Sequence, residues 1–87
     1  MPYIRQTDRK RLDVQIDALA EALKQFPLES LDGCLNYAIT RLLKVLYQPK
    51  YFNYNRAIGV LECCKLEFYR RCISPYEDAK IRENGDV

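Results

Sequence analysis

The feature that most limits how this chain can fold is an apolar side chain at every third or fourth position over much of its length. The first run comprises Leu12, Ile16, Leu19, Leu23 and Phe26, and the second comprises Leu35, Ile39, Leu42 and Leu46. This recurrence follows the period of an α-helix and gives each helix one apolar face. We found no strand-like alternation, so the spacing predicts an all-α fold.

A third apolar segment, residues 55–73, differs because its apolar residues lie on more than one side of the predicted helix. Its stripe comprises Ile58, Leu61, Cys64 or Lys65, Phe68 and Cys72. A helix that is apolar nearly all round is buried or packs on two partners. A chain of 87 residues offers few elements to cover it, and its core is thin. We therefore expect one domain, residues 1–87, built as a small antiparallel bundle of three main helices in a homo-oligomer.

The C-terminal segment predicts a short fourth helix over residues 75–83. Ser74 and Glu77 have the spacing of a capping box, and Pro75 stands where a first helical residue would be. Gly85 then supplies a residue that ends the helix. We expect Tyr76 and Ile81 to anchor this helix onto the rest of the molecule.

Several kinds of chemistry are excluded by what the sequence lacks. The chain contains no histidine, which excludes serine–histidine and cysteine–histidine hydrolases. It has no glycine-rich phosphate loop, and no helix carries the closely spaced carboxylates in an apolar setting by which all-helical nucleotide pyrophosphohydrolases hold magnesium. We expect no enzyme, no catalytic residue, no metal site and no cofactor.

The cysteines and one acidic residue are predicted to serve packing. The four cysteines are Cys34, Cys63, Cys64 and Cys72. They form no C-x-x-C pair, and we expect buried thiols in a reducing compartment. Glu62 lies in the most apolar part of the third helix, so we expect a buried carboxylate paired with Arg41 or Lys65. A role for Glu62 as a general base is the sharper alternative.

Neither a membrane span nor a secretion signal is visible in the chain. No run of about eighteen apolar residues occurs, and the first residues contain no apolar stretch of signal-peptide length. We expect a cytoplasmic protein without a membrane partner.

Positive charge and tyrosines are concentrated in the middle of the chain. Net charge is only +2, which argues against general nucleic-acid binding. Residues 33–72 nevertheless hold seven bases, two acids and five of the seven tyrosines. Arginine binds phosphate with two donors and tyrosine rings stack on bases, so this mixture suits a small nucleotide-like ligand. The candidate ligand-binding residues are Tyr37, Arg41, Lys44, Tyr69, Arg70 and Arg71. The alternative is a solvated basic face with tyrosines at the edge of the core.

Four segments carry a resemblance to other proteins. They are Met1-Pro2-Tyr3-Ile4, the stretch Leu35-Asn36-Tyr37-Ala38-Ile39-Thr40, Tyr69-Arg70-Arg71 and the C-terminal run Pro75-Tyr76-Glu77-Asp78 with Lys80-Ile81 and Glu83-Asn84-Gly85-Asp86-Val87. Together they resemble a family of short uncharacterised proteins of bacteria and tailed bacteriophages. The resemblance implies a phage or prophage origin and brings no catalytic assignment. In size, helix content and basic-aromatic character, the chain also resembles small helical phage oligomers that sequester nucleotide immune signals of the host.

Two functional hypotheses follow from these features. The first is a non-enzymatic homo-oligomer that binds a small phosphorylated ligand at a subunit interface, in the form of a sponge for a host immune signal. The second is a protein-interaction module, an inhibitor or adaptor, that uses the apolar face of the third helix. The first requires arginine and tyrosine side chains around a concave pocket, whereas the second requires an exposed apolar surface.

Overall fold

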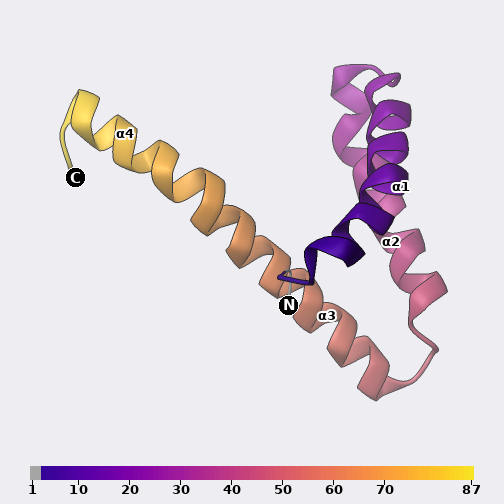
Figure 1. The fold of residues 1–87 in the computed structure, drawn as a ribbon. Helices are drawn as coiled ribbons and strands as arrows, with labels where there is room; N and C mark the ends of the chain where they lie inside the picture. Colours follow the sequence, from indigo (N-terminus) through magenta and orange to yellow (C-terminus); the bar gives the residue numbers. More distant parts are fainter. Residues whose placement is uncertain (1–2) are drawn as a thin grey trace.

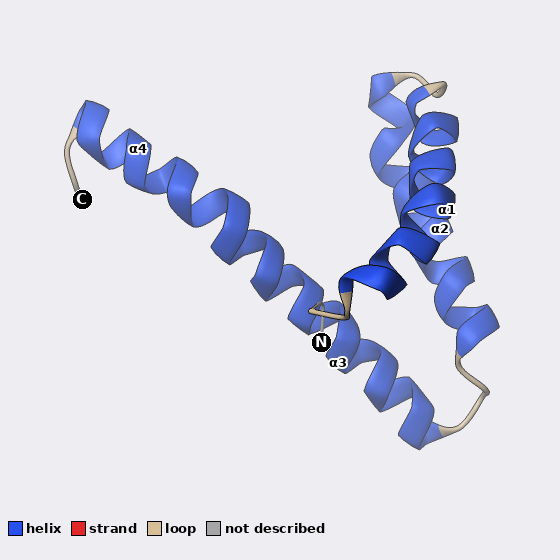
Figure 2. Ribbon diagram, in the orientation of Figure 1, coloured by secondary structure: helices blue, strands red, loops and turns tan. Residues whose placement is uncertain are grey.

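The computed structural model describes residues 3–87, and nearly all of this range is helical, without a strand (Figure 2). Its elements are α1 (Gln6–Lys24), the short 3₁₀ turn η1 (Leu28–Ser30), α2 (Leu31–Leu46), α3 (Tyr51–Phe68), the π-helical segment η2 (Tyr69–Ile73) and α4 (Ser74–Asn84). The predicted all-α class is confirmed, with a short helical piece at the C-terminal end.

The first two helices form an antiparallel hairpin (Figure 1). The helix α1 ends ahead of Pro27, as expected, because a proline disfavours helical geometry in the preceding residue. Pro27 then opens η1, where its carbonyl accepts the N–H of Ser30 at 2.9 Å. This tight connection reverses the chain and brings α2 alongside α1.

The prediction that Ser74 caps a separate helix is wrong. Ser74 has helical dihedral angles, φ −59° and ψ −47°, and makes no capping hydrogen bond through its side chain. Its N–H instead bonds to the carbonyl of Tyr69, five residues back. Proline lacks an N–H and its ring clashes with the carbonyl four residues earlier. The chain accommodates Pro75 by widening one turn into a π-helix, so α3 continues through η2 into α4.

Gly85 ends this long helix, as the sequence predicts. Its φ of +87° is favourable only for glycine, and its N–H bonds to the carbonyl of Ile81 at 2.8 Å. Tyr76 and Ile81 remain 63% and 40% exposed, so they do not anchor α4 onto the rest of this chain. The helix α4 contacts η2 and points away from the hairpin (Figure 1).

Residues 3–87 form almost no hydrophobic core of their own. Ala57, on α3, is the single buried side chain in this range. The chain exposes 8121 Å², whereas a compact protein of this mass exposes about 5,400 Å². Its radius of gyration is 16.4 Å, against about 12 Å for a compact domain of this length. The molecule is therefore an open arrangement of a hairpin and a long projecting helix.

The expectation of buried thiols is wrong for this chain by itself. Cys63, Cys64 and Cys72 are exposed and Cys34 is half-buried. The reason is that the hairpin covers only a small part of α3 and none of the helix beyond it. Every helix in residues 3–87 is too short or too polar to cross a membrane.

Candidate functional site

An open groove runs between the two helices of the hairpin. Its volume is about 560 Å³, and its lining is mainly apolar. Leu19, Leu23 and Phe26 contribute from α1, and Leu42 and Val45 contribute from α2. All of these residues except Val45 belong to the apolar stripes identified in the sequence. They line a groove because α3 turns away at the end of α2 and leaves no third helix to cover them.

Two of the predicted ligand-binding residues lie at this groove. Tyr37 and Arg41 are one helical turn apart on α2, and both contribute to its lining. The Arg41 guanidinium donates from Nη1 to the Tyr37 hydroxyl at 3.4 Å. The pair places a cation and a phenol beside an apolar surface. Lys44 lies further along α2 and is exposed.

The other three predicted residues lie on η2, where carboxylates of the same chain bind them. Arg70 donates to Glu67 at 2.8 Å and also to the Tyr3 hydroxyl, and Tyr3 in turn donates to Glu67. Arg71 lies 3.6 Å from Glu67. Tyr69 donates to a carboxylate oxygen of α4, Oε1 of Glu77, at 3.0 Å. These three side chains are therefore occupied by intramolecular contacts.

The contacts on η2 also shift the ionisation of its groups. The hydrogen bond from Tyr3 is the largest cause that holds the pKa of Glu67 below its usual value, with further lowering from Arg70 and Arg71. The Glu67 carboxylate raises the pKa of Arg70, chiefly by hydrogen bonding. The hydrogen bond to Glu77 likewise raises the pKa of Tyr69. The pKa shifts favour the charged forms of Glu67 and Arg70 and the neutral form of Tyr69, which are the forms that make these hydrogen bonds.

A single chain does not bring the six predicted residues into one pocket. Three lie on α2, which packs against α1 and η1, and three lie on η2, which packs against α3 and α4. The sequence spacing correctly places Tyr37 beside Arg41. It could not reveal the role of Tyr3, whose partners Glu67 and Arg70 are 64 and 67 residues away.

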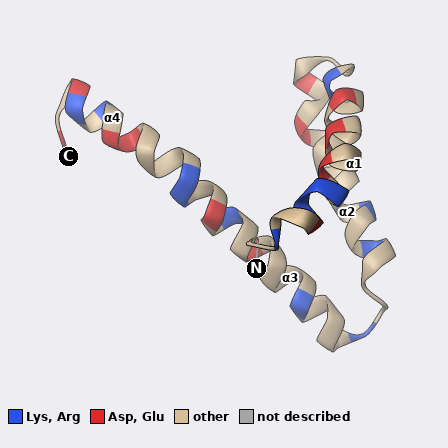
Figure 3. Cartoon of the chain, in the orientation of Figure 1, with Lys and Arg blue, Asp and Glu red and all other residues tan. Residues whose placement is uncertain are grey.

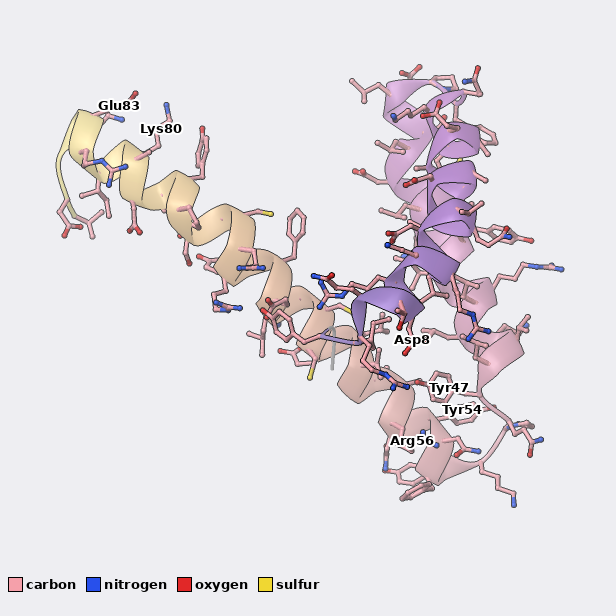
Figure 4. The ribbon with its side chains drawn as sticks, in the orientation of Figure 1. Asp8, Tyr47, Tyr54, Arg56, Lys80 and Glu83 are labelled. Atoms are coloured by element: carbon pink, nitrogen blue, oxygen red, sulfur yellow. The ribbon has the colours of Figure 1, made fainter. Side chains whose placement is uncertain are left out.

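The corner between α2 and α3 gathers a second group of aromatic and basic side chains. The Arg56 guanidinium lies 5.7 Å from the ring centroid of Tyr47 and 6.0 Å from that of Phe52. Figure 4 shows Tyr47, Tyr54 and Arg56 close together at this corner. The sequence prediction omitted Arg56 from the site, although the alternation of bases and aromatics over residues 47–56 was a signal for it.

Polar side chains on α2 and α3 make contacts within their own helices. Glu62 pairs with Lys65 at 2.8 Å, as one of the two predicted pairings has it, but its side chain is 54% exposed rather than buried. On α2, Thr40 donates to the side-chain oxygen of Asn36, four residues earlier, at 3.3 Å. In the range 3–87, no three acidic or cysteine side chains are grouped so that they could hold a metal ion.

Exposed apolar side chains also lie along the long helix. Ile58 is 64% exposed, Leu66 57%, Phe68 62% and Tyr76 63%. These residues extend from α3 through to α4. The prediction that the third helix is apolar on more than one side is confirmed, and most of that surface faces solvent in the single chain.

The fold and these surfaces define a small all-α protein with open, mainly apolar helix faces. A family model, the domain of unknown function DUF6899, matches residues 1–87, and the chain therefore belongs to that family. No curated protein and no solved structure matches the chain. The predicted resemblance to an uncharacterised family is confirmed at that level, and the phage origin stays a prediction.

Proposed function

We propose that this chain is a non-enzymatic interaction module that acts by packing its exposed helix faces against another polypeptide. The observation that supports this most directly is the exposed area of 8121 Å², about 2,700 Å² more than a compact protein of equal mass would expose. Monomeric soluble proteins rarely expose apolar patches beyond a few hundred Å². The large total exposure, together with the many exposed apolar side chains, is typical of a subunit without its partner.

The chemistry of the surface fits this role better than catalysis. The groove between α1 and α2 and the long helix both present aliphatic and aromatic side chains, with charged groups at their edges. Interfaces between proteins have this composition, with an apolar centre and a polar rim. The notable Arg and Tyr side chains of η2 are engaged with carboxylates, which suits a role in holding the helix in place.

Native mass spectrometry and light scattering of the purified protein at micromolar concentration test this function. We expect a particle heavier than the 10.3 kDa chain, because association removes the exposed apolar surface from water. A folded particle of 10.3 kDa, with cooperative unfolding that does not depend on concentration, would contradict the proposal.

A second candidate is a binding protein for a small phosphorylated ligand, and the pair of Tyr37 and Arg41 at the groove supports it. A phage-encoded sponge for a nucleotide immune signal is the form that the sequence resemblance suggests. Calorimetric titration of mono-, di- and cyclic nucleotides should then detect binding. Because a charge-assisted contact contributes about 1.5–3 kcal/mol, Arg41→Ala should weaken that binding about tenfold or more. Absence of heat with every nucleotide would remove this candidate.

A further inference from the structure

We infer that the partner of the long helix is a second copy of this chain, and that two copies pair their residues 52–84 antiparallel about a two-fold axis at Phe68. This inference rests on the proposed function, because it names the polypeptide that binds the exposed surface of the long helix.

The exposed area matches what an obligate dimer removes. Each chain exposes 8121 Å², which exceeds the surface of a compact protein of its mass by about 2,700 Å². A standard interface takes about 800 Å² from each partner, and obligate homodimers bury about 2,000–5,000 Å² in total, or about 1,000–2,500 Å² from each partner. The excess on each chain is therefore large enough for an obligate dimer. A small ligand or a short peptide would leave most of this surface in water, whereas a second chain with an equally long helix would cover the part of it that lies on the long helix.

The charges along the long helix favour an antiparallel arrangement. Residues 50–61 contain Lys50 and Arg56 and no acid, whereas residues 74–87 contain four acids and two bases. Figure 3 shows the basic residues at the start of α3 and the acidic residues on α4, at opposite ends of the helix. Antiparallel copies place each acidic end beside a basic end. Parallel copies would place like charges together, which destabilises an interface.

The helix macrodipole supports the same direction. A helix start carries partial positive charge and is stabilised by acidic neighbours, yet the first turn of α3 has no acid. In an isolated helix, Lys50 and Arg56 at this end would not stabilise the helix dipole. Residues 74–87 of a second copy, in which acids exceed bases by two, lie alongside and supply the negative charge that the start of α3 lacks. The arrangement is self-complementary, as a two-fold dimer requires.

The register follows from the length of the helix. Overlap of residues 52–84 of two antiparallel copies, which leaves out only the first residue of α3, places the axis at their midpoint, Phe68. The Phe68 side chain is 62% exposed, and in the dimer it packs against its own copy. Cys64 and Cys72 are also exposed, and they lie four residues to either side of Phe68 on the same side of the helix. Each Cys64 then lies opposite Cys72 of the partner subunit.

Disulfide formation between native cysteines tests this register. One variant carries Cys34→Ser and Cys63→Ser and so retains Cys64 and Cys72. Two matched variants each lose one more cysteine and retain Cys64 alone or Cys72 alone. Circular dichroism verifies that all three remain helical. Each is oxidised with copper phenanthroline and separated on a non-reducing gel.

We expect the two-cysteine variant to form a covalent dimer and the single-cysteine variants to remain monomeric on the gel. In the antiparallel register, identical cysteines of the two chains are about 12 Å apart along the axis. Disulfides require Cα atoms within about 7 Å. The same spacing prevents Cys64 from bridging to Cys72 within one helix.

Other results would overturn the inference in distinguishable ways. Efficient dimers from a single-cysteine variant would indicate a parallel pair. A native mass above 10.3 kDa without any cross-link would place the interface on another surface. Both results contradict the antiparallel dimer and leave the proposed interaction function intact, whereas a folded monomer contradicts both. If the serine replacements unfold the chain, mass-spectrometric mapping of bismaleimide cross-links in the wild type distinguishes the same arrangements. Cross-links between Cys64 and Cys72 would support the antiparallel pair, and cross-links between two copies of Cys72 would contradict it.

Discussion

Tyr3 connects the beginning of the chain to the middle of the long helix through a single hydroxyl group. That hydroxyl donates to Glu67 and accepts from Arg70, and Glu67 also holds Arg71. In a molecule with one buried side chain among residues 3–87, these polar contacts are a main restraint on how the long helix leaves the hairpin. Residue-scale tests therefore concentrate on this group.

Replacement of Tyr3 by phenylalanine removes the hydroxyl and keeps the ring. Because the Tyr3 hydrogen bond is the largest cause of the lowered pKa of Glu67, we expect that pKa to rise toward its usual value in Tyr3→Phe. NMR titration of the Glu67 carboxyl carbon measures this change. Tyr76→Phe is the matched control, since its ring keeps its contact with Lys80. An unchanged Glu67 pKa in Tyr3→Phe would show that the hydroxyl does not bind the carboxylate in solution.

Acidification should weaken the chain through the same residue. The folded pKa of Glu67 lies below its unfolded value, so its contribution is present above about pH 4.3 and is lost as pH falls through the folded pKa. Urea unfolding of wild type and Glu67→Gln from pH 7 to pH 3 measures this. We expect Glu67→Gln to be less stable at pH 7 and to show the weaker pH dependence. Parallel pH profiles would contradict the assignment.

At the scale of elements, Pro75 decides the geometry of the C-terminal half. The π-helical segment η2 forms because Pro75 cannot donate to the carbonyl four residues back, and the helix widens rather than breaks. The widened turn changes the direction in which the side chains of α4 point relative to those of α3. One proline therefore sets which faces of the long helix are continuous.

Substitutions at positions 74 and 75 distinguish a continuous helix with a π turn from a separate helix that Ser74 caps. Ser74→Ala should change stability by less than about 0.5 kcal/mol, the usual range for surface positions, whereas loss of a true cap costs about 1 kcal/mol. Pro75→Ala should increase stability and helicity, by up to about 3 kcal/mol, because alanine restores the N–H and removes the ring clash. Urea unfolding and circular dichroism at 222 nm check both. A loss of 1 kcal/mol or more in Ser74→Ala would support the cap.

The sequence predicts the elements better than their arrangement, and each difference has a physical cause. The apolar period identifies three helices because it follows the repeat of the α-helix, whether or not another element covers the apolar face. The pattern at Ser74, Pro75 and Glu77 suits both a helix start and an internal π turn. In either place the N–H of one residue makes no helical hydrogen bond, so proline, which has no N–H, can occupy that position. The i,i+4 spacing predicts Tyr37 beside Arg41. Nothing local predicts Tyr3 beside Glu67, because that contact depends on where the long helix crosses the chain start.

For the whole molecule, folding and association are expected to be one process. The free energy of folding in a small domain comes largely from buried apolar surface, and in the single chain Ala57 is the only buried residue of the range 3–87. The proposed pair would bury apolar side chains of the long helix that the single chain leaves in solvent. We therefore expect no stable folded monomer and a stability that depends on protein concentration.

Thermal unfolding at two concentrations measures this dependence. A hundredfold increase in concentration favours a dimer by about 2.7 kcal/mol. For a dimer of this size, we expect a rise in Tm of about 5–10 °C. Circular dichroism at 1 and 100 µM gives the two values. Equal Tm values at both concentrations would show that the single chain is stable without association.

A charge placed at the midpoint of the long helix should separate the two chains. Phe68→Asp removes an aromatic ring whose burial contributes about 3–5 kcal/mol, and near the two-fold axis it sets two carboxylates against each other. We expect the variant to have the mass of one chain and to lose much of its helical signal at 222 nm. Leu28→Asp is the matched control, because Leu28 is 82% exposed on η1, away from the long helix, and it should keep both the mass and the helicity of the wild type. Light scattering and circular dichroism on the same samples decide the matter. A helical, associated Phe68→Asp protein would mean that the midpoint of the long helix lies outside the interface.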